Sequence, residues 1–431
     1  MMFRKKGNLP GFSYINSVSF ILSIFTNSGF GFLFWILAAR YFSAEAVGIT
    51  SSINSVINLF IVFSLIGFET SLLRFLPELN PKDQIKTINN TTLVSGIITL
   101  SLVVFLIIFN FFIPIEPFST LFNDFVFISS FLVLCLVATI TLLQEYFFAS
   151  KELSYYVFIK NLIINLLKIV LLLSFGIMAI FTDFRGIYFP LLASLFLSLF
   201  LSWIIFLPKA YKDYKLTFKI DFPLLKSIIP FSLSNYLEVL INAIPLYIFP
   251  ILIANFVDFE STAYFYIAWF LGYFVFDISS VLSKIMIPEV LNSSKSNLSF
   301  RDNESIKKTA FLMTIIVLPA CIIFFFTPEL VLGVFGSLYV ENAKTLLQIL
   351  AVAGLIVSIN NFFLIFHRLA KSTKRILAIN GANLILTLTL SIPFINEFGI
   401  VGLGYVWFIG QLASLTINVS ILFFKHFTNQ D

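Results

Sequence analysis

Long apolar stretches separated by short polar connections make up most of the chain. A helix needs about 20 apolar residues to cross roughly 30 Å of hydrocarbon, because it rises about 1.5 Å per residue. The pattern predicts twelve such helices, with approximate bounds 15–39, 48–75, 88–113, 124–148, 157–181, 186–207, 227–254, 262–287, 307–332, 343–367, 375–395 and 400–424. We therefore predict an all-α integral membrane protein with about twelve transmembrane helices.

The composition supports this fold class and excludes others. Of the 431 residues, 59% are hydrophobic and 11% are charged, whereas a soluble domain has about 25% charged residues. The net charge of +5 comes from short basic clusters between apolar runs, where orientation in the membrane explains them, so we predict no nucleic-acid partner. Cys135 and Cys321 both lie in apolar segments, so they are expected to be core residues and not a disulfide or metal site.

The distribution of lysine and arginine predicts the orientation. Cytoplasmic loops carry an excess of these residues. If the N-terminus is inside, 23 of the 27 basic residues fall on the inner side, and only Arg40, Arg185 and Lys344 fall outside, with Lys168 inside a span. This imbalance supports an even number of spans, with both termini in the cytoplasm and the protein in the plasma membrane.

The two halves of the chain resemble each other. A shift of 215 positions places several residues of span one on matching residues of span seven, among them Ser17 on Ser232, Asn27 on Asn242, Phe34 on Phe249 and Glu45 on Glu260. With a small change of offset, Asn161 matches Asn380. A shift by six spans gives both halves the same topology, so we predict two parallel six-helix lobes, residues 1–215 and 216–431, around a central cavity where transport sites lie.

The first two spans resemble a known family. Residues 37–48, LAARYFSAEAVG, and residues 65–78, LIGFETSLLRFLPE, are similar to the start of polysaccharide (O-antigen type) flippases of the multidrug/oligosaccharidyl-lipid/polysaccharide exporter superfamily. The resemblance implies a MATE-like fold and export of a polyprenyl-linked oligosaccharide. It also implies membrane lipids and the glycosyltransferases or polymerase of the same pathway as partners. It supplies no catalytic motif.

Polar residues recur at helical spacing inside three of the predicted spans. Because polar groups are costly in a bilayer, they usually face the interior of a helix bundle or a water-filled cavity. Span one carries Asn16, Ser19, Ser23 and Asn27, span five carries Asn161, Asn165 and Lys168, and span seven carries Asn235, Glu238 and Asn242. Together with Asp277 of span eight, these stripes predict a substrate cavity lined by Lys168, Asn27, Asn161, Asn165, Asn235, Asn242 and Asp277.

Two deep charged residues are the main candidates for mechanism. Lys168 lies roughly 20 Å into its helix, too deep for its ammonium to reach the headgroups easily. We expect it to hold a lipid phosphate, and the alternative is an ion pair with Glu238 or Asp277. Glu238 is the candidate for binding a coupling Na⁺ or H⁺, since a desolvated carboxylate protonates more readily, and the alternative is again a pair with Lys168.

Other polar residues and the prolines have weaker assignments. Glu69 and Arg74 lie at the inner end of span two, where an interfacial salt bridge or a gate is expected, and Arg40 at the outer end of span one is expected at the interface. Span seven contains Pro230, Pro245 and Pro250, which predict either a hinge or simple kinks.

Two further functions remain open from the sequence. The deep charges are one lysine and two acids, so a MATE-type antiporter of organic cations is the first alternative. The second is a membrane enzyme of polysaccharide assembly, which would need acids, bases or nucleophiles on a long outer loop. The chain has no such loop, and its two histidines, His367 and His426, both fall on the inner side. We therefore predict no enzyme, no metal site and no cofactor beyond a coupling ion.

Overall fold

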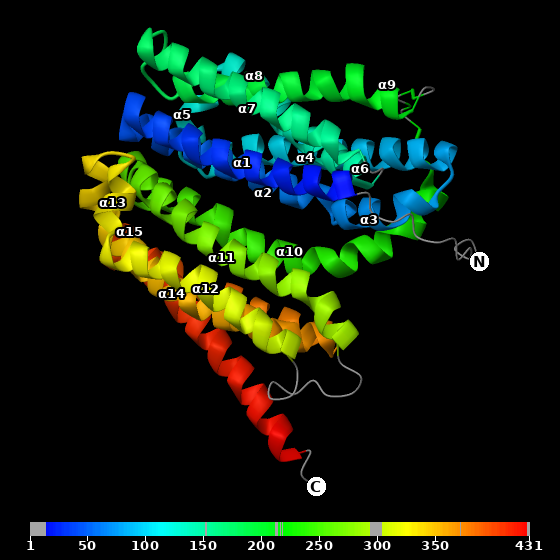
Figure 1. Ribbon diagram of the computed structural model, residues 1–431. Helices are drawn as coiled ribbons and strands as arrows, with labels where there is room; N and C mark the ends of the chain where they lie inside the picture. The colour runs from blue at the N-terminus through cyan, green and yellow to red at the C-terminus, as the bar shows by residue number, and fades with distance from the viewer. Residues whose placement is uncertain are drawn as a thin grey trace. The chain divides into compact units, whose positions relative to one another are not determined.

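The computed structural model describes residues 14–150, 153–211, 214, 215, 217, 219–293, 304–370 and 372–428, and all regular structure in these ranges is helical (Figure 1). The first elements are α1 (Tyr14–Tyr41), α2 (Ala44–Leu65), α3 (Phe68–Phe75), the 3₁₀ helix η1 (Leu76–Glu78), α4 (Pro81–Phe112), α5 (Phe118–Leu121), α6 (Phe125–Ser150), α7 (Ser154–Ile177), α8 (Arg185–Phe200), the π-helix η2 (Leu201–Phe206) and α9 (Leu207–Ala210). The chain continues with α10 (Phe222–Phe256), α11 (Phe259–Ser293), α12 (Glu304–Phe326), α13 (Pro328–Gly333), α14 (Ser337–Leu369) and α15 (Thr373–Thr428).

The predicted spans correspond to these helices. Among the described residues, ten helices are long and apolar enough to cross a membrane. One of them, α15, holds both spans predicted at 375–395 and 400–424, because Gly399 has non-helical dihedral angles (φ 57°, ψ −136°) and divides it into two helices. The 28-residue helix α1 coincides with the first predicted span. The prediction of an all-α, multi-pass membrane protein is confirmed, and twelve spans fit the helices.

The second predicted span is broken near its end. Helix α2 has 22 residues, enough for about 33 Å, and then Ile66 and Gly67 adopt left-handed conformations with φ of 47° and 76°. Left-handed residues end an α-helix, so the eight residues of α3 start a new one. A side chain at Gly67 would place its Cβ only 2.4 Å from the carbonyl oxygen of Ser232 in α10. Glycine is therefore required at this close approach.

Contacts divide the chain into two compact units, Met1–Ala243 (the N-terminal unit) and Ile244–Asp431 (the C-terminal unit). The dividing point lies inside α10, later than the predicted lobe boundary at residue 215, and that boundary stays a prediction about the repeat. The first half of α10 belongs to the N-terminal unit because Leu225 joins an apolar cluster with Leu72 and Phe147. The Ser232 hydroxyl also contacts that of Ser71 at 2.5 Å.

Hydrogen bonds between helices show which of them run in parallel. Two bonds between α1 and α7 join residues that both differ by 138 in number, and two between α14 and α15 join residues that both differ by 51. A constant difference means that the two helices of each pair point the same way. This agrees with the predicted alternation of spans, since α1 and α7 are spans one and five, and α14 and the second part of α15 are spans ten and twelve.

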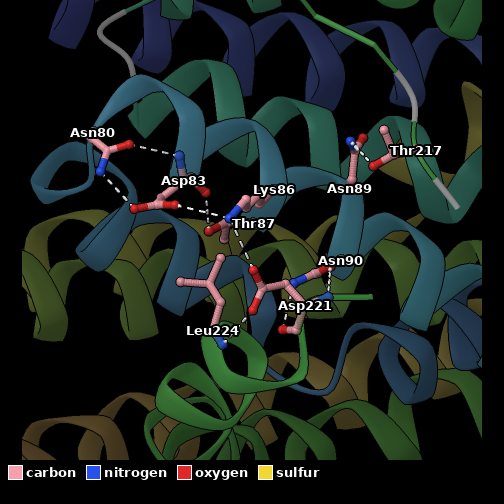
Figure 2. Close-up of polar contacts among 9 residues, drawn as sticks. All are labelled: Asn80, Asp83, Lys86, Thr87, Asn89, Asn90, Thr217, Asp221 and Leu224. Carbon is pink, nitrogen blue, oxygen red and sulfur yellow. Dashed lines mark hydrogen bonds and ion pairs between the residues drawn. The ribbon is translucent and has the colours of Figure 1, made fainter. Parts of the chain in front are cut away.

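The connector between α9 and α10 is anchored on α4 (Figure 2). The Asn90 side chain donates to the Asp221 carbonyl at 3.1 Å and accepts from the Asp221 N–H at 3.0 Å. Asn89 donates to the Thr217 hydroxyl at 3.0 Å, and the Lys86 ammonium lies 3.3 Å from the Asp221 carboxylate. These contacts make the described part of the connector an integral part of the N-terminal unit.

Asp221 also caps the start of helix α10. Its carboxylate accepts from the Leu224 N–H at 3.2 Å, which satisfies one of the unpaired donors at the start of the helix. This bond and the Lys86 ammonium hold the pKa of the Asp221 carboxyl below its usual value. The start of α10 is thus fixed to α4 by both backbone and side-chain contacts.

Candidate functional site

The polar stripes of α1 and α7 face each other in the structure. The Asn161 amide donates to the Ser23 hydroxyl at 2.9 Å, and the Asn165 amide donates to the Asn27 carbonyl oxygen at 2.9 Å. Ser23, Asn161 and Asn165 are buried, whereas Asn27 is exposed. Side-chain hydrogen bonds of this kind hold membrane helices together. Two hydrogen bonds between α1 and α7 thus join four of the predicted polar residues. We call this group, Ser23, Asn27, Asn161 and Asn165, the amide ladder.

Lys168 lies on the next turn of α7 beyond the amide ladder. Its ammonium nitrogen is 4.9 Å from the centroid of the buried Phe34 ring in α1. An aromatic face attracts a cation at this distance. Among the described residues of the N-terminal unit, no carboxylate forms an ion pair with Lys168, so the predicted alternative of a pair with Glu238 is not formed.

A second lysine of α7, Lys160, forms an ion pair that was not predicted from the sequence. Lys160 has a side chain with 0% exposure, and its ammonium lies 2.9 Å from a carboxylate oxygen of Glu145 in α6. The two residues lie on different helices, so no helical spacing relates them. Removing one partner of a buried ion pair leaves an uncompensated charge, which is strongly destabilising. Lys160 is thus part of the helix packing, whereas Lys168, about 12 Å further along α7, has no carboxylate partner among the described residues of its unit.

The structure describes only part of the predicted polar stripe of α10, which consists of Asn235, Glu238 and Asn242. The exposed Asn242 amide donates to the Glu238 backbone carbonyl of its own helix at 2.7 Å, and Glu238 is partly buried. The side chain of Asn235 lies outside the described residues, as does that of Asn16 in span one. The cavity and ion-coupling roles of Glu238, Asn242 and Asn235 stay predictions.

Asp277 of α11 lies in the C-terminal unit near two tyrosines. Its side chain is exposed and interacts electrostatically with Tyr247 of α10 and Tyr273 of its own helix. A carboxylate beside two phenols can share hydrogen bonds with them or with a ligand. The structure therefore places Asp277 in a polar group within the C-terminal unit, and its predicted role in lining a cavity stays a prediction.

The inner end of span two differs from its prediction. The exposed Arg74 guanidinium lies 5.1 Å from the ring centroid of Phe231 and 5.6 Å from that of Phe75, and it does not form the expected salt bridge with Glu69. The aromatic faces compete successfully for the cation because a surface salt bridge contributes little. Burial raises the pKa of the Glu69 carboxyl. Arg40 is exposed in the last turn of α1, where a cation favours the helix dipole.

The C-terminal unit contains a buried chain of four polar side chains that was not predicted from the sequence. His367 contacts the Asn418 carbonyl oxygen at 3.0 Å, and the Asn418 amide donates to Asn360 at 3.1 Å. The Asn360 amide in turn donates to the backbone and side-chain oxygens of Gln411 at 2.9 and 3.1 Å. All four side chains are buried. A spacing of seven residues, which is two helical turns, separates the members on each helix and was the signal available in the sequence.

Comparisons with known proteins give the fold and the family. The sequence profile of the family described as polysaccharide biosynthesis protein matches residues 14–288. A search of the curated proteins finds no match. Among solved structures, the chain is similar to the lipid II flippase MurJ in an inward closed conformation, with 16% identity, coverage of 94% of this chain and 87% of that chain, and a TM-score of 0.67.

Multidrug transporters share the same fold. An inward-facing MATE family transporter of the MOP superfamily has 13% identity, coverage of 94% of this chain and 96% of that chain, and a TM-score of 0.70. An outward-facing one has 12% identity, coverage of 93% and 92%, and a TM-score of 0.60. At these identities the structures show the fold, which is that of MOP superfamily transporters, whereas the profile covers well over half of the sequence. The chain therefore belongs to the polysaccharide biosynthesis protein family.

Proposed function

We propose that this protein is a flippase that moves a polyprenyl-(pyro)phosphate-linked oligosaccharide from the cytoplasmic to the outer leaflet by alternating access, driven by a Na⁺ or H⁺ gradient. Three findings support the proposal. The chain belongs to the polysaccharide biosynthesis protein family, its fold is similar to that of a lipid II flippase, and related folds occur in both inward-facing and outward-facing states. Movement of the two repeated halves would expose a central site to each side in turn.

The main support for the proposal is the position of Lys168, a cation inside a membrane helix that contacts an aromatic ring. A cation in a membrane helix is costly and usually serves a function. Its ammonium contacts Phe34, and an aromatic face is a weaker partner than an anionic oxygen. A phosphate group of the lipid carrier would therefore bind Lys168 without first breaking an ion pair within the N-terminal unit. The exposed Asn27, one turn before Lys168 along the amide ladder, would donate to a second oxygen of the substrate.

Transport of a fluorescent lipid-linked oligosaccharide by the purified protein in liposomes tests this role. We expect Lys168→Met, which keeps the length of the side chain and removes its charge, to abolish transport, and Lys168→Arg to retain part of it. Lys226→Met is the matched control, because Lys226 is exposed at the start of α10. Transport by Lys168→Met at the rate of the unmodified protein would contradict the assignment.

A MATE-type antiporter of organic cations is the second candidate. It is favoured by the TM-score of 0.70 with a MATE family transporter. Lys168, which has no carboxylate partner among the described residues of its unit, argues against it, because a cation site needs acidic or aromatic groups without a competing ammonium. The same liposomes separate the two functions. Efflux of a fluorescent organic cation in exchange for protons or sodium, without movement of the lipid-linked sugar, would favour the antiporter.

A further inference from the structure

Helix α3 packs closely against α10, directly after the break at Ile66 and Gly67. A Cβ atom at Gly67 would lie 2.4 Å from the Ser232 carbonyl oxygen and 3.1 Å from the Tyr236 Cβ atom. One turn later the Ser71 and Ser232 hydroxyls contact each other at 2.5 Å. Both contacts are buried. These contacts leave little freedom for α3 to move relative to α10. A charge that appears at this contact would therefore disturb the packing of both helices.

Glu69 lies in this contact region, on the first turn of α3. Its Oε2 atom is inaccessible to solvent and has no hydrogen-bond partner in the structure. An ionised carboxylate loses its hydration on burial and needs compensating partners, so each buried oxygen without one requires an explanation. Burial raises the pKa of Glu69, and this effect outweighs the opposing backbone hydrogen bond. The protonated form, a neutral acid, is the one that fits such a position.

Among the described residues, no cation acts on the Glu69 carboxyl, whose only resolved influences on its pKa are burial and a backbone hydrogen bond. From α10, Tyr236 interacts with it electrostatically. From α6, Leu143 and Phe147 pack on α3 in one apolar cluster. On its own helix, the Arg74 guanidinium lies over aromatic rings instead. A metal cation would require several oxygen ligands, and no group of three or more acidic, histidine or cysteine side chains that could hold a metal occurs among the described residues. A proton needs only one.

We propose that Glu69 is the carboxyl group that binds the coupling proton. This inference rests on the proposed function and assigns to Glu69 the ion-coupling role that the sequence suggested for Glu238. Helix α10 belongs to the N-terminal unit up to Ala243 and to the C-terminal unit from Ile244 onward. When Glu69 loses its proton, the new charge weakens the contact of α3 with α10, the helix that joins the two units. Proton binding is thereby coupled to the position of a helix shared by both.

The first test needs no substrate and measures thermal stability of the purified protein against pH. Because the folded protein binds this proton more tightly than the unfolded chain, Glu69 stabilises the fold at low pH and loses this effect as pH rises through its raised pKa. We expect Glu69→Gln, which resembles the protonated acid, to melt higher than the unmodified protein at alkaline pH and equally at acidic pH. Glu78→Gln, at an exposed position near the same end of span two, is the control and should not change the profile.

The second test measures transport of the lipid-linked oligosaccharide under an imposed gradient. We expect a proton gradient to accelerate the unmodified protein and Glu238→Gln, and Glu69→Gln to lose this acceleration while still moving substrate at the rate seen without a gradient. Acceleration of Glu69→Gln equal to that of the unmodified protein overturns the proposal, as does acceleration by a sodium gradient alone. If no variant moves the sugar, the proposed function fails, and unchanged melting profiles for Glu69→Gln then refute its proton site separately.

Discussion

Phe34 and Phe249 occupy matching positions in the predicted repeat, yet their surroundings differ. Both rings are buried. In the N-terminal unit, the Lys168 ammonium lies 4.9 Å from the Phe34 centroid. In the C-terminal unit, Phe249 packs against Trp269 at 5.2 Å and Trp407 at 6.5 Å. The offset that matches Asn161 with Asn380 places Thr387 at the position of Lys168. The aromatic residue occurs in both units, but the cation occurs in one.

The polar contacts of the two units differ in the same way. In the C-terminal unit, a buried polar chain is formed by His367, Asn418, Asn360 and Gln411. Every buried side-chain nitrogen and oxygen of these four residues has a hydrogen-bond partner. A satisfied buried network makes a helix contact rigid. The amide ladder of the N-terminal unit instead continues to an exposed asparagine and to Lys168. We therefore expect the C-terminal network to stabilise its unit, and we propose that the amide ladder and Lys168 also contact the substrate.

Placing a lysine at the matching position of the C-terminal unit should have the largest effect. Thr387 has 0% exposure, and a Cβ atom at Gly410 would lie 2.6 Å from its methyl carbon, so there is no space for a longer side chain. We expect Thr387→Lys to lower the stability by about 3–5 kcal/mol, because the charge would be buried without a partner. The measurement is the yield of monodisperse protein and its melting temperature.

Thr387→Met separates the contribution of charge from that of size. Methionine is similar in length to lysine and is uncharged, so it should lower the stability only by the overpacking cost, about 1–3 kcal/mol. If Thr387→Lys were as stable as Thr387→Met, the C-terminal unit would accommodate a cation, and the asymmetry between the two units would lose its physical basis.

Breaking the buried polar chain of the C-terminal unit should have an intermediate effect on stability. Asn360→Leu removes the bonds to Gln411 and Asn418 and leaves their polar groups unpaired, which should lower the stability by about 1–3 kcal/mol. Asn361→Leu is the matched control, because the adjacent Asn361 donates a hydrogen bond to the Ser279 hydroxyl, whose loss should cost about 0.6 kcal/mol. Thermal unfolding in detergent measures both. Equal losses of stability in the two variants would show that the buried polar chain contributes no more than a single hydrogen bond.

Much of the fold follows from the sequence because each apolar stretch must be long enough to cross the bilayer. All twelve predicted spans coincide with helices, and Ser23, Asn27, Asn161 and Asn165 lie on the polar helix faces that the spacing predicted. Periodicity locates the polar face of a helix, and a polar face in a membrane must find another polar face. The spacing therefore identified the polar faces of spans one and five, whereas their contact with each other is a finding of the structure.

The sequence predicted partners less well than faces. The pair of Lys160 with Glu145 and the contacts of Arg74 with Phe75 and Phe231 depend on how different helices pack, which spacing within one helix does not contain. The break at Ile66 and Gly67 was also missed, because an apolar residue in a left-handed conformation leaves no sign in a hydrophobic pattern. Gly67 at this break lies against Ser232 of α10, a contact between distant parts of the chain.

The smallest effect is the coupling between Phe34 and Lys168, which a double-mutant cycle with Phe34→Leu and Lys168→Met measures as thermal stability. We expect a coupling of about 1 kcal/mol, because the ring attracts the partly buried ammonium. The matched cycle in the C-terminal unit combines Phe249→Leu with Thr387→Val. It should be additive within about 0.5 kcal/mol, since the Thr387 hydroxyl donates to the Asn383 and Leu384 carbonyls of its own helix. Equal coupling in the two cycles would mean that the aromatic ring does not hold the charge, and the difference between the units would then lie in packing alone.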